Sequence, residues 1–248
     1  MSVEQDIKEA RYRRPVRGDT LGEQVFRQLS TAILSGTFAP AERINIRKFA
    51  DELRVSVTPA REAVVRLVAD DVLRTTDKNA ILVPERSEAE IVEIFHIRRS
   101  LEGDMAEMAA ARLDREDIRF LEKTQNDFLS FLDRSDYRQV LKINSIFHFY
   151  IYAKSSLPLH LKFAESLWLR IGPTLRYMYP LLHKNRSDHR RHEEIIDCAA
   201  RRDPAALRNA VLADLQSSQN ALMAYVANYN KLAAFHKSSA KLSRHAKN

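Results

Sequence analysis

The chain has 248 residues, 45% of them hydrophobic, which is enough to bury one large core or two modest ones. Its single cysteine, Cys198, excludes an intrachain disulfide and favours the cytoplasm, five glycines leave no glycine-rich phosphate loop, and no apolar stretch is long enough to span a membrane. The net charge of +7 is weak evidence for nucleic-acid binding, because much of it lies in an expected N-terminal arm (residues 1–17) and C-terminal tail (residues 233–248).

Residues 18–86 predict a winged helix-turn-helix. Apolar residues recur at helical spacing from Leu21 to Leu34, and Gly36 then stops the helix. A short helix is expected over Ile46 to Leu53. The segment Ser56 to Pro59 begins a third helix, because hydroxyl side chains can cap it and proline suits a first helical turn. Two short helices joined by a tight turn typically present the second one to the major groove of DNA.

A β-hairpin is expected after the third helix. Residues 72–74 and 80–83 alternate in the manner of strands, and Asn79 lies at the turn, where asparagine tolerates the left-handed conformation. This hairpin would form the wing. Residues 84–87 read as a short polar hinge.

The sequence of this region resembles the GntR family of bacterial regulators. The resemblance rests on the run from Ile33-Leu34-Ser35-Gly36 through Val55-Ser56-Val57-Thr58-Pro59-Ala60-Arg61-Glu62-Ala63. It implies that the following residues lie at the DNA: Arg47, Ser56, Val57, Thr58, Arg61, Lys78 and Asn79. The alternative for Arg61 is an ion pair on the helix surface.

Val57 departs from the family's usual pattern. The family commonly has arginine at this position, and arginine can make a bidentate hydrogen bond to guanine that valine cannot make. We therefore expect a changed operator preference.

The chain beyond the hinge is helical in pattern to its end. Apolar residues between Ile91 and Met108, Ile97 included, are expected on one face of a long helix. Further helices are expected near residues 115–134, 137–155, 158–180, 187–202 and 204–230. The predicted fold is therefore mainly α: a winged helix-turn-helix followed by an antiparallel all-helical bundle of about six helices, at residues 87–232.

The stretch from Ile94 to Ala111 is similar to the opening of the FCD effector domain in the FadR-like branch of this family. The resemblance implies a domain for effector binding and dimerisation. In such domains an acid and three histidines on three helices commonly hold a divalent metal, such as Zn, Mn or Ni, that helps to bind a carboxylate ligand. The corresponding residues of this chain are Asn144, His148, His192 and Asp214.

Asn144 stands where the family has its acid, and Asp214 stands where the family has its last histidine. The set therefore keeps the net charge of the family site, with the acid on a different helix. Asn144 and His148, four residues apart, point the same way from one helix. An amide oxygen is a weaker ligand than a carboxylate, so the affinity for zinc would fall. A harder metal that tolerates oxygen ligands would then become a more plausible occupant. As alternatives, His148 is a hydrogen-bonded core residue, and His192 is a capping or surface group. His189, one turn before His192, could also replace it as a ligand.

Arg98 on the long helix is the candidate for pairing with an anionic effector, since a buried guanidinium holds a carboxylate bidentately. A structural ion pair with Glu102 is the alternative. Further candidates for lining the effector pocket are Tyr150, Tyr152, Trp168 and Arg170.

The expected function is a ligand-responsive repressor of a metabolic operon, bound as a homodimer to two-fold symmetric operator DNA and sensing a small organic acid. One alternative is a metal-dependent hydrolase or lyase that uses His148, His192 and Asp214. That enzyme would need an open coordination position and a general base, and it would leave the helix-turn-helix unexplained. Another alternative is a regulator that dimerises but senses nothing.

Overall fold

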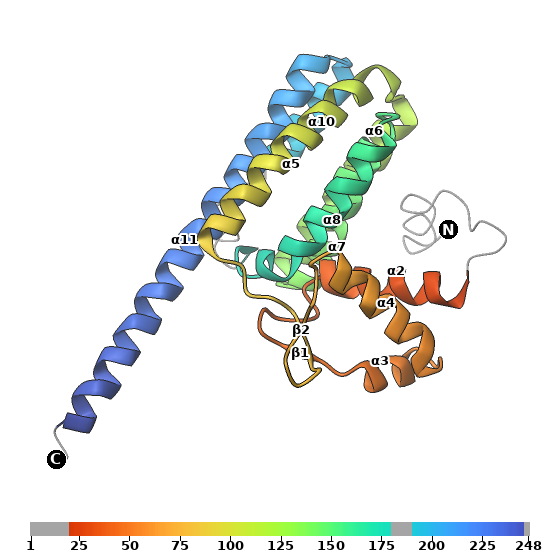
Figure 1. Ribbon diagram of the computed structural model, residues 1–248. Helices are drawn as coiled ribbons and strands as arrows, with labels where there is room; N and C mark the ends of the chain where they lie inside the picture. The colour runs from red at the N-terminus through yellow and green to blue at the C-terminus, as the bar shows by residue number, and fades with distance from the viewer. Residues whose placement is uncertain (1–19, 180–189, 246–248) are drawn as a thin grey trace.

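The computed structural model describes residues 20–179 and 190–245, except for the side chains of residues 229–245. The basic arm at residues 1–17 and His189 lie outside the described residues. A small winged domain lies at one end of a long helical bundle (Figure 1).

The winged domain is built on three helices, α2 (Leu21–Leu34), α3 (Ile46–Glu52) and α4 (Val57–Ala69). Side chains cap the first two: Thr20 accepts from the backbone N–H of Glu23, and Asn45 accepts from that of Lys48. Helix α4 follows Ser56, so Pro59 lies in its first turn, as the sequence predicts.

The wing is a three-stranded antiparallel sheet of β1 (Arg43–Ile44), β2 (Arg74–Thr75) and β3 (Ile81–Leu82), in the order β1-β3-β2. Arg74 is paired with Leu82 across the hairpin. Asn79 has a φ of 55° at the turn, as its position in the sequence predicts. Strand β1 was not expected from the sequence, because a two-residue strand shows no alternation and its ladder partner, β3, comes almost forty residues later.

The bundle contains α5 (Glu88–Ala109), the 3-10 turn η1 (Ala110–Arg112), α6 (Arg115–Asp133), α7 (Tyr137–Ala153), α8 (Pro158–Leu175), α10 (Arg190–Arg201) and α11 (Pro204–His245). Helix α11 runs along α5 and then projects beyond the bundle (Figure 1). From the sequence, this helix was expected to end near residue 230, but it continues to His245. Residues 231–245 contain neither glycine nor proline, so nothing in their composition stops a helix.

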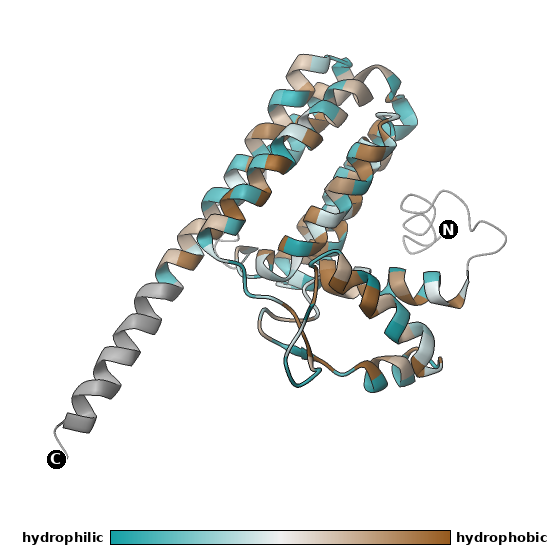
Figure 2. Cartoon of the chain, in the orientation of Figure 1, coloured by the Kyte–Doolittle hydropathy of each residue, from teal (hydrophilic) through white to brown (hydrophobic). Residues whose placement is uncertain are grey.

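Apolar residues line the inner faces of the bundle helices and polar residues cover their outer faces (Figure 2). On α5 the expected apolar face is wrong for Ile97 and Met108, which are exposed. The buried stripe of this helix instead includes Arg98 and Glu102, because these two lie in line with the apolar residues at helical spacing. No helix in the described ranges has the length and apolar character that a bilayer crossing requires.

Helix α8 of the bundle packs against the winged domain. A Cβ atom on Gly172 would lie 3.1 Å from the Cα atom of Leu34, at the end of α2. On either side of this contact an arginine donates to a backbone carbonyl of the winged domain. Arg170 Nε of α8 donates to Asp70, and Nη1 of Arg176, the C-cap of α8, donates to Gly36, each at 3.0 Å. Asp70 is the C-cap of α4, so α8 touches the end of that helix directly.

The expected hinge is also held in place by ion pairs of Arg86. Its side chain is 2% exposed and donates through Nη1 to Asp71 Oδ2 at 2.7 Å and to Glu90 Oε1 at 3.2 Å. Burial raises the pKa of Asp71, but the hydrogen bond and charge of Arg86 outweigh it and leave that pKa below its ordinary value. The link between the domains therefore makes specific polar contacts with both of them.

Candidate functional site

Helix α4 presents a polar face at one end of the molecule. Thr58 and Arg61 are exposed on its first turns, and Ser56 occupies the N-cap without using its side chain to cap the helix. Val57 is half-buried and packs against the hydrophobic core. The ion pair that α4 makes with α2 uses Arg66 rather than Arg61. Arg61 thus extends into solvent from the helix that the sequence predicts to enter the major groove.

The other candidate DNA contacts lie at the same end of the molecule as α4. Arg47 is exposed on α3, which packs against α4. Lys78 and Asn79 are exposed between β2 and β3, at the turn of the hairpin. Positive side chains therefore project from both the helix-turn-helix and the wing, an arrangement suited to phosphate contacts beside a groove.

The bundle brings His148 of α7, His192 of α10 and Asp214 of α11 together. Their ligating atoms all lie within 4.8 Å of one another. His148 Nε2 is 3.3 Å from Asp214 Oδ2. Both histidines are buried, and the Asp214 side chain is 14% exposed. Asn144 lies one turn before His148 on α7 and is half-buried.

Each imidazole of this cluster has its Nδ1 atom in a hydrogen bond to a residue outside the cluster. His192 Nδ1 lies 2.7 Å from Gln125 Oε1, an atom that can only accept, so Nδ1 donates. His148 Nδ1 lies 3.3 Å from the hydroxyl of Tyr152, which itself donates to Glu102. This arrangement leaves the Nε2 atoms for the cluster, as in histidines that bind metals.

The charge and the spacing of the cluster fit a divalent cation. Burial raises the pKa of Asp214, but its hydrogen bond to His148 and the charges of His148, His192 and Arg98 outweigh it, so the pKa lies below its ordinary value. The carboxylate is therefore ionised at neutral pH. The 3.3 Å between His148 Nε2 and Asp214 Oδ2 matches two ligands that each lie about 2.0–2.2 Å from a shared metal.

Arg98 is buried and makes the ion pair with Glu102 that the sequence left as an alternative. Arg98 Nε donates to Glu102 Oε1 at 2.6 Å, and its guanidinium carbon lies 4.3 Å from the Trp168 ring centre. Glu102 is fully buried and also accepts from Trp168 Nε1 at 3.0 Å and from the Tyr152 hydroxyl at 2.7 Å. One carboxylate thus connects Arg98, through Tyr152, to His148.

The candidate lining residues do not lie together in one place. Tyr152 and Trp168 belong to this buried network, whereas Tyr150 donates to Asp117 and Arg170 contacts the winged domain. Sequence reasoning missed Gln125 entirely. It lies 67 residues before His192 and belongs to no motif, so only the packing of α6 against α10 could reveal it.

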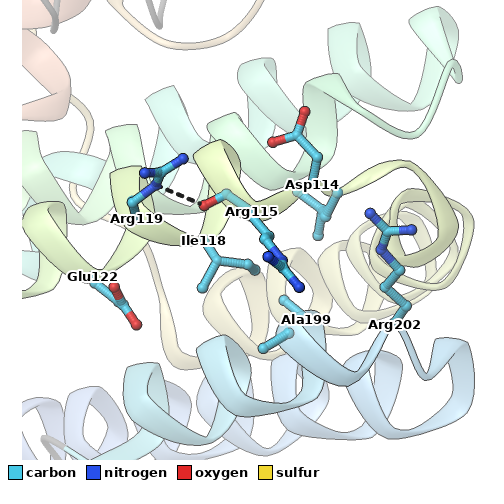
Figure 3. A pocket seen from close by; sticks show the side chains of 9 residues that line it. Asp114, Arg115, Ile118, Arg119, Glu122, Ala199 and Arg202 are labelled. Atoms are coloured by element: carbon cyan, nitrogen blue, oxygen red, sulfur yellow. Dashed lines mark hydrogen bonds between the residues drawn. The ribbon is translucent and has the colours of Figure 1, made fainter.

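An arginine-rich groove of about 730 Å³ lies away from the cluster, between the start of α6 and the end of α10 (Figure 3). Arg115, Arg119 and Arg202 border it and are exposed. Arg119 Nε donates to the backbone oxygen of Arg115, as the dashed line shows. Asp114 is engaged as the N-cap of α6. These are the polar contacts of an exposed helix start, and they leave the buried cluster as the candidate site of the bundle.

Comparisons with known proteins agree with this architecture. Residues 21–83 match the model of the bacterial regulatory proteins of the gntR family, and residues 93–217 match the FCD domain. The HTH-type transcriptional regulator McbR of Escherichia coli is 31% identical over 171 residues, or 69% of this chain and 76% of that protein. An uncharacterised HTH-type regulator, YdhC of Bacillus subtilis, is 26% identical over 77% of this chain and 85% of that protein.

Solved structures give the same result. The structure of E. coli McbR/YncC has a TM-score of 0.78 at 26% identity and covers 83% of this chain and 98% of its own. A putative GntR regulator from Rhodococcus sp. RHA1 shares the fold, with a TM-score of 0.66 at 19% identity over 82% of this chain and 97% of its own. The relatives are regulators of transcription, so the hydrolase or lyase alternative is set aside. The chain belongs to the GntR family of transcription regulators and carries an FCD effector-binding domain.

Proposed function

We propose that the protein is a cytoplasmic, homodimeric repressor of a metabolic operon, released from or held on its operator by a small organic acid bound beside a metal in the FCD domain. The cluster of His148, His192 and Asp214 within 4.8 Å is the observation that carries the sensing part of this proposal. The repressor part draws support from GlaR of E. coli, which is named a transcriptional repressor and is 30% identical over 87 residues, 35% of this chain and 40% of that protein.

The proposed DNA contacts are Arg47, Ser56, Val57, Thr58, Arg61, Lys78 and Asn79. Their exposure on α3, α4 and the wing supports this assignment, apart from the half-buried Val57. Because valine cannot donate to guanine, we propose that the operator lacks the guanine preference that an arginine at position 57 confers. Selection from randomised operators should show this difference, and Val57→Arg should restore the preference. The same preference in both proteins would contradict the proposal.

A second copy of the chain is proposed to pack on α5 and α8. These neighbouring helices expose large apolar residues: Ile97 and Met108 on α5, and Leu159 and Phe163 on α8. Large apolar residues that stay exposed on neighbouring helices often mark an interface. Sedimentation should give a dimer that Phe163→Glu, at a residue 59% exposed, dissociates. Val65→Glu on α4, at a residue 68% exposed, is the control and should remain dimeric; equal sedimentation of the two variants would contradict this interface.

The metal would be held by His148, His192 and Asp214, with Asn144 as a fourth, weaker ligand. When bound, the cation would supply positive charge for an anionic effector. Elemental analysis of protein purified without chelators, followed by titration with Zn²⁺, Mn²⁺ and Ni²⁺, tests this assignment. Asp214→Asn should lose the metal, whereas His160→Asn, at a half-buried histidine paired with Asp104 outside the cluster, should retain it. Wild-type protein that neither contains nor takes up metal would contradict this part.

The proposed effector is a small carboxylate, which Arg98 would contact through the Nη1 edge of its guanidinium, because Nε and Nη2 donate to Glu102. Thermal-shift screening of small organic acids should find compounds that raise the melting temperature. The same compounds should change operator affinity, since an effector regulates only if it binds the two states differently. A screen without hits would favour the regulator that dimerises and senses nothing.

A further inference from the structure

His192 is held by a residue that lies outside the proposed ligand set. Gln125 of α6 is buried, and its Oε1 lies 2.7 Å from Nδ1 of His192. An amide oxygen has no hydrogen, so the imidazole must donate from Nδ1. In the neutral ring the lone pair is then on Nε2. The hydrogen bond thus decides which nitrogen of His192 can serve as a ligand.

Two phenylalanines fix the plane of this ring but not its direction. Phe147 stacks on the imidazole at 4.2 Å with 12° between the ring planes, and Phe128 lies 5.0 Å away at 57°. A stacked imidazole can still flip by 180° about its Cβ–Cγ bond and return to the same plane, because its two edges have nearly the same shape. The edges differ in hydrogen bonding, and Gln125 accepts from only one of them. Packing and hydrogen bonding together therefore select one orientation.

We propose that Gln125 is the positioning residue of the cluster: it holds His192 with the proton on Nδ1 and so presents Nε2 to His148 and Asp214. The importance of this orientation for metal binding rests on the function proposed above, but the orientation itself requires no metal. A partner that fixes the orientation of a histidine ligand in this way is typical of metal centres.

The neutrality of Gln125 has an electrostatic consequence. Among the three clustered residues Asp214 alone carries negative charge, and the amide of Gln125 adds none. A divalent cation would therefore leave the centre with a net positive charge, which favours an anionic effector. A carboxylate at position 125 would keep the orientation of His192 but cancel that excess charge.

Nitrogen NMR of the metal-free full chain with isotope-labelled histidine tests the proposal at alkaline pH, where imidazoles are neutral. His192→Asn assigns the signal. The wild-type ring should be protonated on Nδ1, and Gln125→Leu should move the proton to Nε2, the site favoured in unconstrained imidazole. Gln125→Glu, which retains an acceptor, should preserve the wild-type form. A wild-type proton on Nε2, or an unchanged spectrum in Gln125→Leu, would overturn the proposal.

Thr124→Val is the matched control, because Thr124 is the buried neighbour on α6 and its hydroxyl donates to the Phe120 carbonyl rather than to the cluster. Its His192 signal should equal that of wild type. In a Zn²⁺ titration Gln125→Leu should bind about 10–100-fold more weakly, and Gln125→Glu and Thr124→Val should not be weakened. Equal affinities of wild type and Gln125→Leu contradict the positioning role. If wild type takes up no Zn²⁺, the metal centre is refuted, and the NMR comparison decides whether Gln125 orients His192.

Discussion

The proposed DNA-binding face, formed by exposed residues of α3, α4 and the wing, and the buried cluster hold their polar residues in opposite ways. On the face, Arg47, Thr58 and Arg61 extend into solvent from short helices. In and beside the cluster, polar side chains hold one another: Gln125 holds His192, and Glu102 holds Arg98 and Tyr152.

Because of this difference, replacing a residue should affect folding stability and function separately on the proposed DNA-binding face, but together in the buried cluster. Exposed side chains contribute little to folding, so their replacement should affect DNA binding alone. Buried polar side chains lose a partner when one of them is replaced, so stability and ligand binding should fall together. The face can therefore change its specificity one residue at a time, whereas the cluster changes as a unit.

The largest effect is expected at Glu102. Glu102→Gln leaves the buried guanidinium of Arg98 without its counter-charge, and the free energy of unfolding should fall by about 3–5 kcal/mol. Urea denaturation measures this loss. Glu107→Gln changes an exposed glutamate of the same helix and should fall within about 0.5 kcal/mol of wild type. A small effect at Glu102 would remove the distinction between the two regions.

Arg61→Ala tests the proposed DNA-binding face. It should weaken operator binding by about 1–3 kcal/mol, measured by fluorescence anisotropy at fixed salt, without lowering the free energy of unfolding. Arg115→Ala at the far end of the bundle is the control, because it removes the same charge away from the DNA. If both variants lost affinity equally, net charge rather than position would explain binding.

Tyr150→Phe should have a moderate and pH-dependent effect. Burial raises the pKa of Asp117, but hydrogen bonds from Lys154, Tyr150 and the backbone of Asp114 leave it below its ordinary value of 3.8. Their stabilisation is therefore complete above that value and is lost as the pH falls through the lower, folded-state pKa. The variant should lose about 1–2 kcal/mol at neutral pH and less in acid, in urea denaturation at each pH. A constant loss across the series would contradict the ionised state of Asp117.

The smallest effect is expected in the turn between α3 and α4. Arg54 has a φ of 55°, a conformation that glycine adopts without strain. Arg54→Gly should raise the free energy of unfolding by about 0.5–1 kcal/mol in thermal denaturation. Operator affinity should not rise with it, because the variant removes a positive charge from the DNA-binding domain. A parallel rise in stability and affinity would show that the two properties are coupled on this face too.

The sequence predicted the elements whose signals are local. The start of α4 near Ser56, the turn at Asn79 and the helices of the bundle all follow from caps, turns and spacing. The proposed ligands His148 and His192 could be named from resemblance, but their partners could not. Gln125 and the Tyr152–Glu102 link join helices far apart in the chain, and such pairings depend on packing that no local pattern encodes.

The contact at Gly172 bears on the geometry of the operator. A Cβ atom at this position would lie 3.1 Å from the Leu34 Cα atom, so the end of α2 would have to shift by a few tenths of an ångström relative to α8. In a dimer, such a shift would change the distance between the two recognition helices, which must match the separation of the half-sites along the DNA. The absence of one methyl group in the bundle would then help to decide how many base pairs separate the halves of the sequence that the protein binds.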